Sequence, residues 1–371
     1  MKTCSLFLII SLIAIAAETK SPVEIRSSKA DFRLETVSED LENPWSIGFT
    51  PEGILITERR GKIKLFSNGA LYEIAGLPEI SSGGQGGLLD IAVSPDYAND
   101  RMIFFTFVKQ GSSGRGTALA SAKLNGRTLE NVKILWEMNR LTRTSIHFGS
   151  RLRFLKDGTI IFTTGDRGDS SRAQDLSDSA GKVHRIKRDG SIPSDNPFIN
   201  TAGAVKSIYS YGHRNSQGIA VRGSDGTIWL SEHGPQGGDE INLIRKSGNY
   251  GWPVITYGRN YGTGTKIGEG TSKHGMEQPL LYWSPSIAPS GLEFYSGRLF
   301  PQWKGNLFSG ALAGERLVRI EISGNNVTGQ ELLIQRIAGR IRDVRESPEG
   351  YIYFITDEKR GALYRITPRI N

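Results

Sequence analysis

Cysteine is almost missing from this chain of 371 residues, whose single copy is Cys4. A chain without a second thiol forms no internal disulfide and offers no cysteine-ligated zinc site. Because Cys4 lies inside an expected targeting segment, we expect the mature chain to carry no thiol, which also excludes a cysteine nucleophile. Such a chain suits an oxidising compartment.

Long hydrophobic runs are equally scarce, and the only one spans residues 5–17 (SLFLIISLIAIAA). Lys2 precedes it and small residues end it, which is the pattern of a secretory signal peptide. The run is shorter than the roughly 20 residues that cross a bilayer, although a retained anchor is the alternative. We therefore expect residues 1–17 to be a removed signal peptide and the mature protein to be periplasmic or secreted, with no membrane span.

Motifs of several common enzyme classes are absent as well. The sequence contains no H-x-x-x-H pair, no G-x-S-x-G elbow and no Walker or Rossmann glycine pattern. The net charge is +8, but the basic residues are dispersed, with no block longer than pairs such as Arg59-Arg60. Dispersed charge indicates a solvated basic surface, with a few arginines left to face an anionic ligand, and we expect no nucleic-acid partner.

Glycine is abundant, with 45 copies, and it punctuates a repeated pattern. In each repeat an alternating apolar strand is followed by a turn with Pro, Asp or Gly and by a second strand. The repeats occupy residues 45–59, 89–107, 150–166, 217–234, 290–312 and 341–358. This pattern predicts an all-β fold: a six-bladed β-propeller of four-stranded antiparallel blades, forming one catalytic domain over residues 28–371. A β-sandwich or two small barrels are the alternatives.

Polar residues gather where the second strands end, as in Asp166, Glu232 and Asp357. Strand ends that converge on a propeller channel predict a site, but not its chemistry. His147 precedes the hairpin that ends at Asp166, so a carboxylate is placed to support an imidazole base. A histidine satisfied within the fold is the alternative.

Three further segments carry groups that suit a ligand. Arg214 and Asn215 lie in a glycine-rich loop, where a guanidinium can bind carboxylates. Arg340 and Arg342 are two apart, on one face of an expected strand, which suits a polyanion. The turn at 234–242 combines Gly, Pro, Asp, Glu and Asn, the oxygen-rich composition that calcium prefers. A polar loop between blades, an exposed strand face and a metal-free acidic turn are the respective alternatives.

Together these motifs resemble the soluble aldose sugar dehydrogenases that use pyrroloquinoline quinone, relatives of soluble glucose dehydrogenase and the sorbosone dehydrogenases. The resemblance covers nearly all of the mature chain and rests on motifs in the same order. They are NPWSIGF (43–49), GGQGGLLDIAVSPDY (83–97), HFGSRL (147–152), DNPF (195–198), YGHRNSQG (211–218), EHGPQGGDEIN (232–242), NYGWP (249–253), IAPSGLEFY (287–295) and RIRDV (340–344).

The resemblance implies that His147 is the general base for the sugar C1 hydroxyl, while the C1 hydride passes to C5 of the quinone. Asp166 and Arg214 would complete the catalytic set. The cofactor would be lined by Gln85, Arg214, Asn215, Tyr261, Leu312, Ala313, Arg340 and Arg342. One calcium would use the backbone carbonyls of Gly234 and Pro235, and a second, structural calcium would use Glu240 and Tyr250.

Two departures from soluble glucose dehydrogenase affect this expectation. Ile146 stands where that enzyme has an aspartate before its histidine, which leaves Asp166 as the support of His147. Ala313 stands where it has a lysine, which predicts weaker cofactor binding or looser substrate choice. Both favour an aldose dehydrogenase of broad range, with an unidentified electron acceptor. The alternatives are a calcium-dependent propeller lactonase or esterase, against which the arginines argue, and a non-catalytic binding propeller.

Overall fold

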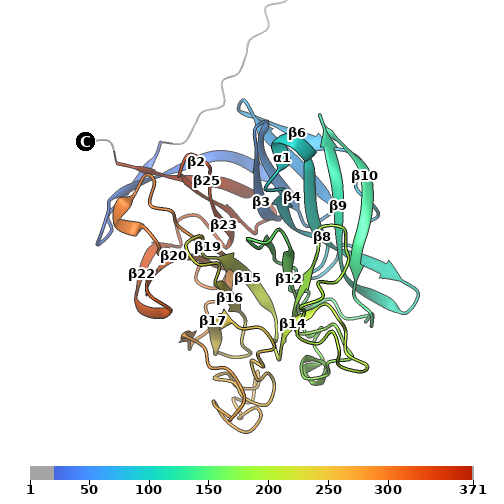
Figure 1. Cartoon of the computed structure of the whole chain (residues 1–371). Coiled ribbons are helices and arrows are strands. Elements are labelled where there is room, and N and C mark those ends of the chain that lie inside the picture. Colours follow the sequence, from blue (N-terminus) through green and yellow to red (C-terminus); the bar gives the residue numbers. More distant parts are fainter. Residues whose placement is uncertain (1–20, 370–371) are drawn as a thin grey trace, which may run out of the picture.

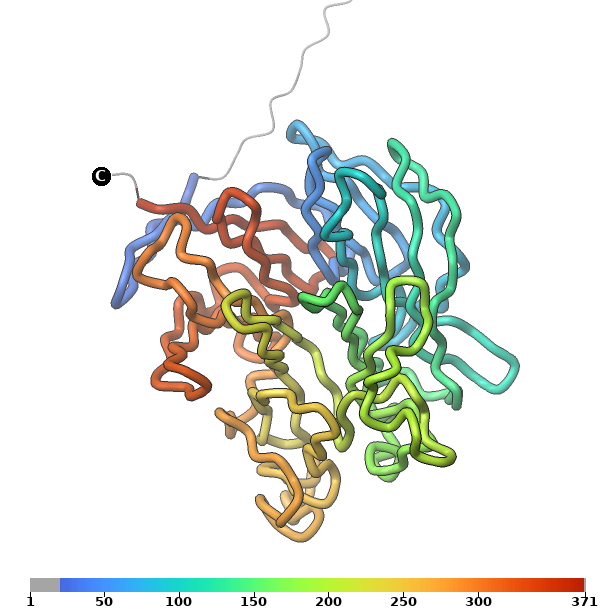
Figure 2. Tube along the Cα trace, viewed as in Figure 1, coloured from blue at the N-terminus to red at the C-terminus, as the bar shows by residue number. Residues whose placement is uncertain are grey.

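Six antiparallel sheets form a β-propeller in the computed structural model, which describes residues 21–369 (Figure 1). The predicted six-bladed architecture is confirmed, and each predicted repeat supplies the first two strands of one blade. Figure 2 shows the chain passing round the ring until its last blade lies beside its first. The expected signal peptide falls outside the described residues. Within residues 21–369, no helix has the length and apolar character needed to cross a membrane.

The first three blades each come from one continuous segment. The first blade contains β3 (Pro44–Thr50), β4 (Gly53–Glu58), β5 (Lys62–Ser67) and β6 (Ala70–Ile74). The second contains β7 (Leu88–Val93), β8 (Met102–Gly111), β9 (Gly114–Asn125) and β10 (Thr128–Glu137), with the short helix α1 (Tyr97–Asp100). The third contains β11 (Leu152–Phe154), β12 (Ile160–Thr164), β13 (Lys182–Ile186) and β14 (Ile208–Tyr211), with the 3₁₀ turn η1 (Ser170–Ala173).

The fourth and fifth blades follow the same plan. The fourth contains β15 (Ser216–Val221), β16 (Ile228–Glu232), β17 (Asp239–Ile244) and β18 (Leu281–Trp283). The fifth contains β19 (Pro289–Phe294), β20 (Leu307–Ala311), β21 (Arg316–Ser323) and β22 (Asn326–Gln335), with η2 (Pro301–Trp303). The long segment 245–280 connects β17 to β18.

The sixth blade is built from both ends of the described chain. It contains β23 (Ile341–Glu346), β24 (Ile352–Thr356) and β25 (Gly361–Pro368), followed by β2 (Phe32–Leu41) and β1 (Val23–Ile25). β2 pairs antiparallel with β25 from Phe32 opposite Pro368 to Leu41 opposite Gly361. β1 gives this blade a fifth strand that begins before the predicted start of the domain at residue 28.

Apolar side chains fill the spaces between blades, as the alternation of the strands requires. Leu55 and Ile63 of the first blade pack with Ile91, Phe105 and Ala120 of the second, and all five are buried. Each large side chain buried in this way contributes about 1.5–3 kcal/mol. The blades are therefore held against one another by ordinary hydrophobic packing, which leaves the axis free for polar groups.

One residue from each innermost strand, or directly before it, reaches the axis, and we call this set the axial layer. It consists of Ser46, Asp90, Arg151, Gly218, Gly291 and Asp343. In five of the six blades this position lies at a register shift between the first two strands. Such a bulge turns a side chain away from the pleat.

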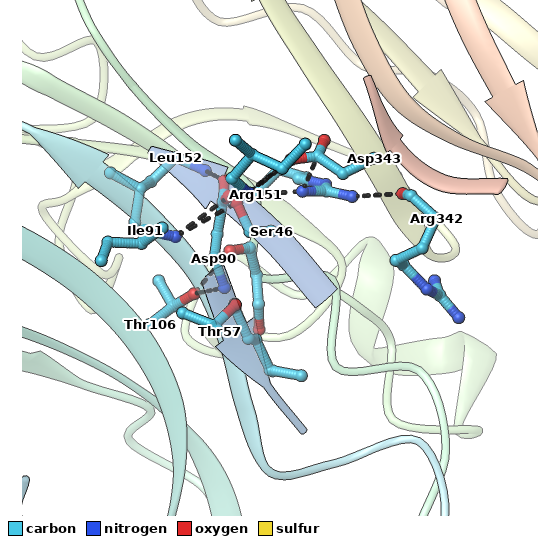
Figure 3. A network of polar contacts seen from close by, with 12 residues as sticks. Ser46, Thr57, Asp90, Ile91, Thr106, Arg151, Leu152, Arg342 and Asp343 are labelled. Atoms are coloured by element: carbon cyan, nitrogen blue, oxygen red, sulfur yellow. Dashed lines mark hydrogen bonds and ion pairs between the residues drawn. The ribbon is translucent and has the colours of Figure 1, made fainter. Parts of the chain in front are cut away.

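The axial layer is closed around Arg151, which is fully buried (Figure 3). Its Nη1 lies 3.3 Å from Oδ1 of Asp90 and 3.0 Å from Oδ1 of Asp343. Glycine is required at 291, because a β-carbon there would lie 2.2 Å from Oδ1 of Asp343. The axis is thus plugged by a buried ion network, and any ligand must lie to one side of it.

Candidate active site

Two adjoining cavities lie at one end of the channel and share Gln85, Asn215 and His233 in their walls. The arginine cavity, of about 220 Å³, is lined by Arg59, Arg340 and Arg342 among others. The histidine cavity, of about 550 Å³, opens beside His147.

The structure brings the predicted catalytic and cofactor residues to these two cavities. The arginine cavity receives Gln85, Asn215, Leu312, Ala313, Arg340 and Arg342. The histidine cavity receives Gln85, His147, Asp166, Arg214, Asn215, Tyr261 and the predicted calcium ligand Pro235. The structure shows that these residues line the two cavities, whereas the chemical role of each residue stays a prediction.

His147 is held by its backbone as well as by its ring. It has a left-handed φ of 53°, and its N–H donates to Oε1 of Gln85 over 2.7 Å. Its carbonyl packs against Gly165, where a β-carbon would lie 2.2 Å from that oxygen. Because the main chain on both sides is constrained, the imidazole has a fixed place at the cavity wall.

The ring of His147 pairs with Asp166, with 2.7 Å between Nδ1 and Oδ1. Asp166 also accepts hydrogen bonds from the N–H of Gly168 and from Nε1 of Trp252, each over 2.8 Å. Burial alone would raise the pKa of Asp166, but the contacts with His147 and Gly168 hold it below its usual value. An ionised Asp166 accepts a hydrogen bond from an N–H at Nδ1, and the tautomer favoured in this way has its free lone pair on Nε2.

Arg214 joins the histidine cavity to the glycine-rich turn. Its Nη1 donates to the carbonyls of Gly234 over 2.8 Å and His233 over 3.2 Å, and its guanidinium lies 5.4 Å from the ring of Trp252. Its backbone N–H donates to Oε2 of Glu232 over 3.0 Å. The carbonyl predicted to bind calcium at Gly234 therefore already faces one cation.

Positive charge exceeds negative charge in the arginine cavity, where Asp357 is the only acidic residue of the lining. Arg342 pairs with Asp357 and donates to Oε1 of Gln217 over 2.9 Å, while its buried Nε has no partner among the described residues. Burial would raise the pKa of Asp357, but Arg342 and Arg59 lower it to about 2. Two guanidinium groups thus contact one carboxylate, and a third, that of Arg340, lines the same cavity.

The predicted calcium turn has two parts with different chemistry. Asp239 belongs to this turn, and both of its carboxylate oxygens accept hydrogen bonds within the fold. Oδ1 accepts from the N–H of Gly234 over 2.9 Å, and Oδ2 accepts from the N–H groups of Ile287 and Ala288 over 2.8 Å each. Asp239 therefore ties the fourth blade to the start of the fifth.

A third, very small cavity of about 10 Å³ is lined by Glu232, Glu240 and Tyr250 among others, and it has room for one water molecule or ion. Nδ2 of Asn242 donates to both carboxylates, whereas its buried Oδ1 has no partner in residues 21–369. Burial and the neighbouring Glu232 raise the pKa of Glu240 to about 8. Two crowded carboxylates beside an orphaned amide oxygen suit a cation.

Tyr250 can serve a metal here only through its backbone. Its phenol donates to the carbonyl of Leu243 over 2.6 Å and accepts from the N–H of Arg245 over 2.8 Å. Within residues 21–369 no cluster of three His, Cys, Asp or Glu side chains is arranged for a metal. A cation at this place would therefore need backbone carbonyls, which calcium accepts readily.

Sequence reasoning missed several residues of the lining, among them Trp45, Arg59 and Trp252 as well as the role of Asp357. A signal for two of them was present. In five blades the residue directly after the second strand is Arg59, Gly165, His233, Leu312 or Asp357. Four of these line the arginine cavity. Superposing the repeats would have placed Arg59 beside the residues already singled out.

Comparison with known proteins agrees with this geometry. A family model described as Glucose / Sorbosone dehydrogenase matches residues 41–365. The aldose sugar dehydrogenase of Escherichia coli K12 is 39% identical over 353 residues, covering 92% of this chain and 95% of that protein. The crystal structure of the soluble aldose sugar dehydrogenase from Escherichia coli in the apo-form has a TM-score of 0.89 at 39% identity, and covers 91% of this chain and 100% of that chain.

A structure with its cofactor is also similar. The PQQ-bound form of aldose sugar dehydrogenase from Streptomyces coelicolor has a TM-score of 0.74 at 28% identity, and covers 92% of this chain and all of that chain. The match of the family model extends from the end of β2 through most of β25, and so includes every blade. This chain belongs to the glucose/sorbosone dehydrogenase family.

Proposed function

We propose that this protein oxidises aldose sugars at C1 to lactones, with bound pyrroloquinoline quinone as the hydride acceptor and His147 as the base. The observation that carries the proposal is the sharing of Gln85 and Asn215 between the His147 cavity and the arginine cavity. A proton acceptor and an anion site thus have common walls. Residues 1–17 would direct export to the periplasm or the medium.

The arginine cavity fits the quinone in charge. The cofactor is a tricarboxylate, and guanidinium groups bind carboxylates with short, charge-assisted hydrogen bonds. Arg342 has an unpartnered buried N–H, and Arg340 is exposed at the cavity wall. The polar side chains of Gln85 and Asn215 supply neutral hydrogen-bonding groups beside them. Bound there, the quinone would supply the electrophilic carbonyl carbon that accepts the C1 hydride.

His147 is built to take the proton of the sugar C1 hydroxyl at Nε2. Asp166 fixes the tautomer through Nδ1 and stabilises the imidazolium that forms. Trp252 and Gly168 in turn orient Asp166, so the base cannot rotate away from the cavity. A base placed in this way contributes about 10²–10⁴-fold to the rate.

Calcium would occupy two places in this proposal. The carbonyls of Gly234 and Pro235 would hold one ion, which supplies positive charge to the quinone carbonyl. Glu240 and the backbone carbonyl of Tyr250 would hold the other, structural ion. The crowding of Glu232 against Glu240 and the orphaned oxygen of Asn242 support a cation at the second place.

The test is oxidation of a panel of aldoses by the purified protein with an artificial dye as electron acceptor. Four conditions are compared: no addition, calcium alone, quinone alone, and both. We expect turnover only where the quinone is present, with the highest rate when calcium is added too. Turnover that does not depend on the quinone would overturn the proposal. Lactone hydrolysis without any sugar oxidation would instead establish the calcium-dependent lactonase alternative.

The base role has its own test in the variant His147→Gln. Glutamine keeps a polar side chain of moderate size but cannot take a proton at neutral pH. We expect turnover to fall by about 10²–10⁴-fold, while the dissociation constant of the quinone, measured by equilibrium dialysis, changes little. Retained turnover in this variant would remove His147 from the base role.

A further inference from the structure

Arg59 is the one arginine of the arginine cavity to which the sequence assigned no function. It directly follows β4 of the first blade and lines the cavity together with Arg340 and Arg342. Its backbone is fixed, because its N–H donates to the carbonyl of Asn43 over 3.1 Å and its carbonyl accepts from Leu88 over 3.0 Å. The side chain therefore starts from a defined point on the wall.

The guanidinium of Arg59 has no close acidic partner among the described residues. Its nearest acidic partner is Asp357, at 3.6 Å between Nη1 and Oδ2, which is beyond hydrogen-bond distance. Asp357 makes its closer contact with Arg342. The Arg59 side chain is only 23% exposed, so it has lost much of its hydration without gaining a hydrogen bond within residues 21–369. A partly desolvated cation of this kind is stabilised by an anion that enters the cavity.

The part of the cavity wall that comes from the fifth blade carries no charge. Leu312 and Ala313, directly after β20 of the fifth blade, present apolar side chains to the same cavity. We expected Ala313 to weaken cofactor binding because it brings no positive charge. Arg59 supplies a positive charge from the first blade, and together with Arg340 and Arg342 it gives the cavity three guanidinium groups.

We propose that Arg59 is a cofactor-binding residue that pairs with a carboxylate of the bound quinone. This inference rests on the proposed function, because it assumes that the tricarboxylate enters the arginine cavity. It goes further by adding Arg59 to the residues expected to hold the cofactor. The competing explanation is that Arg59 serves only as a partner of Asp357, and the experiment is designed to separate the two.

The first experiment measures the dissociation constant of pyrroloquinoline quinone by equilibrium dialysis at fixed calcium. In Arg59→Met we expect binding to weaken by about tenfold to a hundredfold, which is the usual value of a hydrogen bond to a charged group. Arg60→Met is the matched control, because Arg60 is the next residue but pairs with Glu42 on the surface, 2.8 Å away. Its affinity should equal that of the wild type.

Arg59→Lys is a milder variant for the case that Arg59→Met folds poorly. Lysine keeps the charge but loses the planar pair of N–H groups, so we expect a smaller loss of affinity than with methionine. Equal affinity for the quinone in wild type, Arg59→Met and Arg59→Lys would overturn the inference while leaving the proposed function intact. No binding of the quinone by the wild type would overturn the proposed function itself.

The second experiment repeats the measurement in an Asp357→Asn background. If Arg59 contacts the quinone, Arg59→Met costs at least tenfold in affinity in this background too, because the lost contact does not involve Asp357. If Arg59 acts only through Asp357, its substitution has no effect once that carboxylate is gone. The second result would overturn the inference. The readout is binding and not turnover, so it is independent of the chemistry at His147.

Discussion

The axial layer with its neighbours and the arginine cavity are both rich in arginine, yet they differ in charge balance. Along the axis, three guanidinium groups meet three carboxylates within 3.7 Å: Arg151, Arg153 and Arg345 with Asp90, Glu293 and Asp343. In the arginine cavity, three guanidinium groups line the wall with Asp357 as its one acidic residue, and two of them, Arg59 and Arg342, lie within 4 Å of that carboxylate. Burial raises the pKa of Glu293 to about 8, so Asp90 and Asp343 supply most of the negative charge that holds the axial guanidinium groups in the fold. The larger surplus of positive charge in the cavity is available for an anionic ligand.

The two regions are connected through the main chain of Arg342. Arg151 donates from Nη2 to the carbonyl of Arg342 and from Nε to that of Gln217, each over 2.7 Å. Figure 3 shows that the side chain of Arg342 points away from the network that holds its carbonyl. The guanidinium of Arg151 also lies 4.0 Å from the ring of Trp45, another residue of the cavity wall. The ion network therefore supports three residues of the cavity wall: Trp45, Gln217 and Arg342.

Removing the central arginine of the axial ion network should reduce the free energy of unfolding more than any other change proposed here. Arg151→Met leaves Asp90 and Asp343 without their central partner in a fully buried place. We expect the free energy of unfolding to fall by about 3–5 kcal/mol, measured by guanidinium denaturation. Arg60→Met, on the surface, should change it by no more than about 0.5 kcal/mol. A loss below about 1 kcal/mol in Arg151→Met would mean that the axial network is not structural.

The carboxylate beside His147 should matter for turnover more than for stability. Asp166→Asn still offers an oxygen to Trp252, but it no longer fixes the imidazole tautomer or stabilises the imidazolium. We expect kcat to fall by about a hundredfold, with an unchanged dissociation constant for the quinone. A rise in KM alone, at full kcat, would show that Asp166 shapes the sugar site and does not support the base.

Asp357 should make the free energy of unfolding depend on pH in the acid range. Its pKa is about 2 in the folded protein and about 3.9 in an unfolded chain, so its ionised form stabilises the fold above pH 3.9. This contribution, about 2 kcal/mol, is lost as the pH falls from 3.9 towards 2. Unfolding free energies of wild type and Asp357→Asn should therefore converge over this range. Parallel curves would show that the pairing with Arg342 and Arg59 is energetically unimportant.

Substitution of Arg340 should change stability and quinone binding the least. It is exposed, and its guanidinium makes only a 3.5 Å contact with the carbonyl of Leu312. We expect Arg340→Gln to leave the free energy of unfolding within about 0.5 kcal/mol and to weaken quinone binding by roughly fivefold. A clear loss of stability would contradict the view that the surplus charges of the cavity do not hold the fold.

Local patterns were sufficient to predict the blades. Alternation and turn residues lie within each repeat, and the hairpin that joins His147 to Asp166 could be recognised because both partners belong to one segment. The axial layer could not be predicted, since Ser46, Arg151 and Asp343 lie in different blades and meet only when the ring closes. The same reason hid the contact of Arg59 with Asp357, whose sequence separation is almost the whole domain.

Asp239 shows a different limit of sequence reasoning. Its acidic, glycine-rich surroundings are equally compatible with a metal ligand and with a turn that caps neighbouring backbone N–H groups. Composition cannot separate a metal ligand from a capping residue, because the carboxylate oxygens serve in both cases, either by coordinating a cation or by accepting hydrogen bonds. The structure adds what composition lacks: the N–H groups of Ile287 and Ala288, directly before the fifth blade, donate to Oδ2 of Asp239.

The pairing of β2 with β25 has a consequence for how the chain is made. Five blades consist of consecutive segments and can form one after another as the ribosome adds residues. The sixth blade must wait, because β2 is synthesised near the beginning and β25 near the end. Until then β2 lacks its partner strand, and its unpaired edge favours aggregation of the incomplete chain. Completion of the ring is thus a late event of biosynthesis, and only then can the ion network at the axis be enclosed.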